Sequence, residues 1–70
     1  MMAEFAPTVA YVLAYKQGKR FSKAANTARL FTMGSMNIAD EMGFERDSLE
    51  WKGAMMGAMH HIDTLQEAMQ

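Results

Sequence analysis

The amino-acid sequence predicts an all-α protein, in which an antiparallel helical hairpin and a short N-terminal helix assemble as a homodimeric bundle. Two long segments carry apolar residues at alternating steps of three and four, which is the spacing of packed helices. The link from Gly43 to Asp47 is short, and short links favour antiparallel packing of neighbouring helices. The apolar bands are wider than a two-helix contact needs. We therefore expect a single helical domain over residues 1–70 and a second copy that covers the remaining apolar surface.

The first expected helix covers residues 3–17. Its apolar residues follow helical spacing: Phe5, Val9 and Val12. Pro7 falls in the first turn, where its missing N–H has no helical partner. Gly18 fits the left-handed position that follows many helix ends. Residues 8–15 are also rich in β-forming side chains, so a strand is the alternative for this segment.

The second expected helix covers residues 22–42, and the third covers residues 48–68. Ser22 is expected to cap the second helix, and the glycine that follows the segment is expected to end it. Asp47 or Ser48 is expected to cap the third helix. The seam of the second helix comprises Phe21, Ala24, Ala28, Phe31, Ser35, Ile38 and Met42. The seam of the third comprises Trp51, Met55, Ala58, Ile62, Leu65 and Met69.

Small residues recur one turn apart in the third expected helix, at Gly53 and Gly57 with Ala54 and Ala58. Each glycine costs about 1 kcal/mol of helix propensity relative to alanine. We therefore expect a close crossing with another helix or a contact with a partner, and a locally weakened helix is the alternative. The wide apolar bands place the dimer interface on the second and third helices, and its expected residues are Phe31, Ile38, Trp51, Met55, Ile62 and Leu65.

Composition limits the classes of function that the chain supports. It has seventy residues, a net charge of −1 and no cysteine, which excludes disulfides and thiolate metal sites. The longest apolar run, residues 9–15, is far shorter than the roughly 20 residues that span a bilayer, so we expect a cytoplasmic protein with no membrane partner. No nucleophile motif or glycine-rich phosphate loop is present, so we expect neither enzymatic activity nor a cofactor. His60, Asp63 and Glu67 share a helix face, which we interpret as solvated surface rather than a metal site.

A basic segment adjoins two tyrosines. The cations Lys16, Lys19, Arg20, Lys23 and Arg29 occur without an intervening acid, whereas residues 40–70 carry all but one of the acids in the chain. Such asymmetry can mark a binding face. Tyrosine, arginine and methionine are enriched in protein interfaces, and methionine supplies nine of the seventy residues. The expected partner-binding residues are Tyr11, Tyr15, Lys19, Arg20 and Lys23.

The segment around the link resembles the helix-turn-helix of DNA-binding proteins, over residues 37–52. The resemblance is carried by Ile38, Ala39, Met42, Gly43, Phe44 and Leu49. The segment departs from that family at Lys52, where an apolar residue is usual. Three acids between residues 45 and 50 oppose contact with phosphates. A strand over the first segment would instead allow a strand-helix-helix dimer, whose paired strands read a DNA groove.

The function that these observations favour is a small non-enzymatic interaction module. It would be a regulator or inhibitor that binds another protein, a class common among phage and mobile-element products. The reasons are the absence of catalytic motifs and the surplus of apolar, methionine and aromatic side chains. The alternative is a DNA-binding transcriptional regulator of the helix-turn-helix or strand-helix-helix type. A second copy and another protein are therefore expected partners, and nucleic acid is the less favoured one.

Overall fold

The computed structural model describes residues 2–70, with side chains described from Val9 onward. Its helices are α1 (Met2–Ala24), α2 (Thr27–Met33), α3 (Ser35–Glu41) and α4 (Leu49–Ala68). The described chain contains no strand, so the all-α class is confirmed and the strand alternative for residues 8–15 is wrong.

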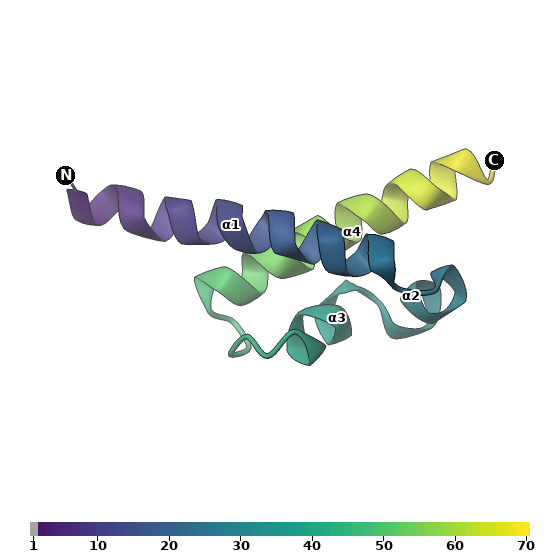
Figure 1. Ribbon diagram of the computed structural model, residues 1–70, viewed down its shortest axis with the longest axis horizontal. Helices are drawn as coiled ribbons and strands as arrows, with labels where there is room; N and C mark the ends of the chain where they lie inside the picture. The colour runs from purple at the N-terminus through teal and green to yellow at the C-terminus, as the bar shows by residue number, and fades with distance from the viewer. Residues whose placement is uncertain (1) are drawn as a thin grey trace.

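The two long helices cross at close range (Figure 1). Gly53 faces the backbone of Tyr11 and Gly57 faces the backbone of Tyr15, so both helices run in the same direction through the crossing. A Cβ added at Gly18, Gly53 or Gly57 would stand closer than 3.0 Å to a carbonyl oxygen of the facing helix. The glycines are therefore required for the approach of the two backbones. The prediction of a close crossing at Gly53 and Gly57 is confirmed, and the partner is α1 of the same chain.

The expected antiparallel hairpin of two long helices is wrong. Helix α4 packs chiefly on α1, and residues 22–42 are divided among the end of α1, α2 and α3. The first break falls at Asn26, whose extended backbone and side-chain oxygen, 2.9 Å from the Ala28 amide nitrogen, begin a new helix. The second break falls at Gly34, whose φ of 81° ends α2 in a conformation that glycine adopts without a steric penalty. Helices α2 and α3 thus form a bent return segment beneath the crossing (Figure 1).

The expected end of the first helix at residue 17 and the expected start of the second helix at residue 22 are also wrong. Gly18 does not end the first helix, because α1 continues to Ala24. Gly18 serves instead to admit the backbone of Ala54. Ser22 is not a cap but a fully buried residue of α1, and its hydroxyl has no hydrogen-bond partner.

The start of α4 and the end of α3 agree with the predictions from the sequence. Ser48 caps α4, with its hydroxyl oxygen accepting a hydrogen bond from the Trp51 amide at 3.1 Å. Gly43 follows the end of α3 with a φ of 91°. The cap of α4 and the end of α3 were therefore correctly predicted.

The core consists of two adjoining apolar clusters. One joins Ala14 of α1, Ala39 of α3, and Trp51 and Ala54 of α4. The other joins Leu30 of α2, Ile38 of α3 and Ala58 of α4. Met42 packs against both clusters, so all four helices share a continuous interior.

Candidate functional site

Helix α1 presents an uncovered face opposite its contact with α4. Successive residues of a helix turn by about 100°, which places positions 9, 12, 13, 16, 20 and 23 on the side away from Gly18. Val9, Val12 and Leu13 are 53%, 43% and 54% exposed. Three exposed cations continue the same face toward the helix end. We call this surface the outer stripe, and it comprises Val9, Val12, Leu13, Lys16, Arg20 and Lys23.

The cations of the outer stripe have no carboxylate partner within residues 9–70. The ion pairs described there join Arg29 to Glu41 and Arg46 to Asp40. Lys23 lies in the last turn of α1, where a positive charge suits the negative end of the helix dipole. The stripe is therefore apolar in its first half and positively charged in its second half.

The expected partner-binding residues divide between two sides of α1. Arg20 and Lys23 lie on the outer stripe, whereas Tyr11 and Tyr15 are half-buried beside α4. The Tyr15 hydroxyl oxygen lies 2.6 Å from Nδ1 of His60, and the two rings meet edge to face. The Lys19 ammonium lies 5.6 Å from the centroid of the Tyr15 ring. The two tyrosines thus belong to the crossing, and Lys19 lies beside them rather than on the stripe.

The expected dimer-interface residues also lie in different environments. Ile38 and Trp51 are 0% and 3% exposed and belong to the core of the chain. Three others are half-buried and pack against that core, namely Met55, Ile62 and Leu65. Phe31 is exposed on α2. Ile38 and Trp51 are therefore buried within the single chain.

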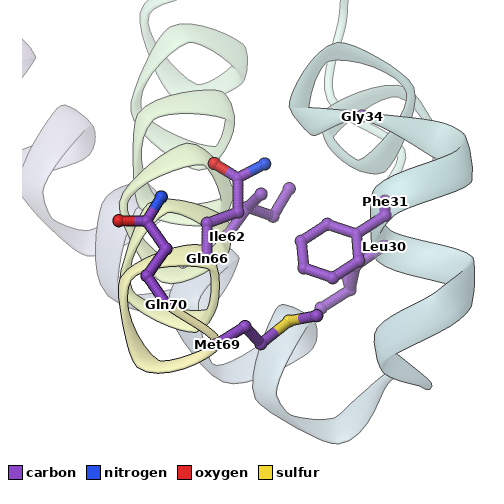
Figure 2. Close-up of a pocket in the computed structure, with 7 residues that line it drawn as sticks. All are labelled: Leu30, Phe31, Gly34, Ile62, Gln66, Met69 and Gln70. Carbon is purple, nitrogen blue, oxygen red and sulfur yellow. The ribbon is translucent and has the colours of Figure 1, made fainter.

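A shallow hollow of about 560 Å³ lies between α2 and the end of α4. Figure 2 shows Leu30 and Phe31 on one side facing Ile62, Gln66 and Met69 on the other. Its lining is apolar apart from the amides of Gln66 and Gln70. These residues provide no acid, base or nucleophile, so the hollow offers contact area but no catalytic group.

A charged cluster fastens α3 to the start of α4. The Trp51 indole nitrogen donates a hydrogen bond to Asp40 at 2.7 Å, and the Arg46 guanidinium donates to the same carboxylate at 2.5 Å. The Arg46 guanidinium carbon also lies 5.4 Å from the centroid of the indole ring. Hydrogen bonds from Arg46, and then from Trp51, lower the pKa of Asp40, and the same contact raises the pKa of Arg46. This cluster stabilises the turn and leaves no free reactive group.

No three His, Asp or Glu side chains of the described chain come together to hold a metal ion, so His60, Asp63 and Glu67 do not form such a group. Within residues 2–70 no helix combines the length and the apolar character required to cross a bilayer.

The sequence carries the helical spacing of the outer stripe, but the helix end expected at residue 17 divides this pattern in two. Positions 9, 12, 16, 20 and 23 recur at steps of three and four, which places them on one face of a continuous helix. Ending the helix at residue 17 separates the aliphatic residues from the later cations. The exposure of the apolar half does not follow from the spacing, because exposure of an aliphatic residue depends on which face the partner helix covers.

Comparison with models of protein families gives no match, and comparisons with curated proteins and with solved structures find no similar chain.

Proposed function

We propose that the protein is a small non-enzymatic interaction module that regulates or inhibits another protein by binding it through the outer stripe. The observation that supports the proposal is the combination of three half-exposed aliphatic side chains with three exposed cations on one face of α1. Exposed apolar residues scattered singly are normal on protein surfaces. A contiguous row that continues into unpaired charge is the pattern of a contact surface.

A helix with one apolar face commonly docks into an apolar groove of its partner. In the outer stripe, Val9, Val12 and Leu13 would supply the buried contact. Lys16, Arg20 and Lys23 would steer the approach of an acidic surface and fix the direction of the helix in the groove. Lys19, beside the stripe, would contribute at the rim, whereas Tyr15 belongs to the crossing with α4.

The proposal includes two further expectations. The first is a homodimer, since apolar side chains such as Phe31 and Met69 stay exposed on the single chain. The second is a cytoplasmic location without a membrane partner. The proposal likewise expects no enzymatic activity.

Affinity capture from a nuclease-treated extract of the cells that encode the protein tests the proposal. Three baits are compared: the unmodified chain, the triple variant Lys16→Gln/Arg20→Gln/Lys23→Gln, and Lys52→Gln as a control cation on α4. We expect the captured protein to be lost with the triple variant and kept with the control. Exposed substitutions change stability little, so circular dichroism should show all three folded. Equal capture by all three baits would contradict the assignment of the stripe.

A titration with the purified partner extends this test. The triple variant should bind more weakly and with a smaller salt dependence, because screening suppresses attraction between exposed charges. Unchanged affinity at low salt, together with an unchanged melting curve, would mean that these cations are only solvated.

DNA binding is the alternative function. Five cations occur in α1 and α2, which favours contact with phosphates. However, the strand-helix-helix form needs a strand that the described chain lacks. In the helix-turn-helix form, Glu45, Asp47 and Glu50 would face the DNA backbone. Recovery of nucleic acid alone, in a capture without nuclease, would favour this alternative.

A further inference from the structure

The outer stripe is long, narrow and straight. Its first and last residues, Val9 and Lys23, are 23 − 9 = 14 positions apart on one helix, a length of about 21 Å at 1.5 Å per residue. Between them the stripe recurs at steps of three and four, the spacing with which one helix packs along another over several turns. Helices that cross at about 20° stay in contact over such a length. A surface of this shape is therefore matched along its whole length by another helix.

The first half of the stripe lies close to a part of α1 that the rest of the chain does not support. Gly53, near the start of α4, meets α1 at Tyr11. Residues 2–10 precede this contact and form about 2.5 turns of helix, which project past the start of α4 (Figure 1). Helices in proteins gain most of their stability by packing one face against a neighbour. A helix lying along the stripe would supply such packing to the projecting end of α1.

The second half of the stripe selects the charge of that helix. Lys16, Arg20 and Lys23 are exposed on one face of α1, and the ion pairs described within residues 9–70 involve other cations. An apolar or basic helix would leave these three charges unmatched. A helix with acids at the facing positions would pair with them, and aliphatic side chains in its other half would cover Val9 and Leu13.

The order of the two halves along α1 indicates the direction of the partner helix. In an antiparallel pair, the first half of the partner helix lies beside the second half of α1, which holds the cations. Acids in the first turn of a helix are stabilised by the positive end of its dipole, whereas acids in the last turn are destabilised. Only the antiparallel arrangement lets the acids pair with the stripe and also stabilise their own helix.

Building on the proposed function, we propose that the partner surface that meets the outer stripe is an amphipathic helix antiparallel to α1. Its seam carries acids in the first half and aliphatic side chains in the second half. The stripe then recognises the order of charge and apolar surface along a helix. An acidic segment in the opposite order is bound more weakly, because its acids lie at the wrong end of its dipole.

Synthetic peptides of about 20 residues are long enough to form helices and serve as probes. The acid-first peptide carries glutamates on the seam of its first half and leucines on the seam of its second half. The acid-last peptide contains the same residues with the two halves exchanged. The lysine peptide is the acid-first peptide with lysine in place of each glutamate. Fluorescence anisotropy of each labelled peptide, titrated with the full chain at low ionic strength, measures its affinity.

We expect the acid-first peptide to bind at least about threefold more tightly than the acid-last peptide, and at least about tenfold more tightly than the lysine peptide. The variant Lys16→Glu/Arg20→Glu/Lys23→Glu should reverse the second preference and bind the lysine peptide. An unfolded variant could not gain a specific ligand in this way, so the reversal separates loss of contact from loss of fold. The matched control is Lys52→Glu, an exposed cation of α4, and it should keep the original preferences.

The direction of the bound peptide is measured by energy transfer. The chain has no cysteine, so Ala24→Cys, at the exposed end of α1, provides a single site for a fluorescent label. Transfer from this label should be greater to a dye on the N-terminus of the acid-first peptide than to one on its C-terminus. The opposite result would overturn the antiparallel arrangement.

Failure of the proposed partner helix is distinguishable from failure of the proposed function. A protein that is captured through the stripe, and that a saturating amount of the acid-first peptide does not displace, would keep the proposed function and overturn the partner helix. Equal binding of the three peptides would overturn it as well, because the stripe would then recognise no order of charge. A dimer of the chain that the stripe variant abolishes would assign the surface to a second copy, and stripe-dependent sedimentation with anionic lipid vesicles would assign it to a lipid surface; either result would overturn the proposal.

Discussion

Replacing Gly57 by alanine tests the close crossing of α1 and α4 most directly. In an uncrowded helix this change should stabilise the protein by about 1 kcal/mol, because glycine is the poorer helix former. Here the new Cβ would stand closer than 3.0 Å to the Tyr15 carbonyl oxygen and 3.0 Å from the Lys19 amide nitrogen. Both are backbone atoms, which cannot move aside as a side chain can. The helices would therefore have to separate.

The expected loss follows from these two opposing effects. Overpacking a well-packed interior costs about 1–3 kcal/mol and occasionally more, and backbone clashes belong at the upper end of that range. After the gain in helix propensity we expect a net loss of about 2 kcal/mol. A chain of seventy residues has roughly 4–10 kcal/mol in total. The melting temperature should fall by roughly 8–16 °C, given about 4–8 °C per kcal/mol for a chain of this size.

Urea and thermal unfolding followed by far-UV circular dichroism measure this loss. The matched control is Thr64→Ala, which introduces the same residue at an exposed position of the same helix. The control should be neutral or slightly stabilising. A Gly57→Ala variant as stable as the unmodified chain, or more stable, would refute the packing described for the crossing.

Three further predictions concern stability. Ser22→Ala should raise the free energy of unfolding by about 1 kcal/mol, since the buried hydroxyl has no partner to offset its desolvation; a decrease on urea unfolding would mean that the hydroxyl is hydrogen-bonded. Leu30→Ala should cost about 2–5 kcal/mol because this side chain is buried between helices. Its exposed neighbour Phe31 is the control, and an equal loss in Phe31→Ala would contradict the burial described here. Hydrogen bonds from Arg46 and Trp51 lower the folded pKa of Asp40 below its unfolded value of about 3.8, so its contribution to stability is present above that value and is lost as pH falls through the folded pKa. Asp40→Asn should therefore reduce the acid-side decline in melting temperature, and an unchanged pH profile would argue against the cluster.

The sequence predicted the parts of the fold that depend on neighbouring residues. Ser48 has a hydroxyl that can accept a hydrogen bond from a free amide at a helix start, and Gly43 can adopt the positive φ found after many helix ends. The cap of α4 and the end of α3 were therefore placed correctly. The paired glycines of α4 also indicated a close crossing. The identity of the partner helix was not predictable by these means, because it depends on which of several apolar faces meet.

The errors have a common physical origin in residues that serve more than one purpose. Glycine ends helices and also permits close backbone contact, and Gly18 has the second role. Asn26 interrupts a long apolar pattern with a local cap, a signal that the regular spacing on either side obscured. The extent of α1 determined the candidate site, since the outer stripe exists only on a helix that continues past Gly18.

The crossing of α1 with α4 also affects how the chain folds. The residues that meet there, such as Tyr11 and Gly53, are separated by most of the sequence. Helical proteins usually fold fast because their contacts are local, and folding slows as contacting residues lie further apart in the chain. Here the main helix contact joins α1 to α4 across the whole of α2, α3 and the turn. Closing this long intervening segment costs conformational entropy before the contact of α1 with α4 stabilises the chain. The protein should therefore fold more slowly than a simple helical hairpin of equal length.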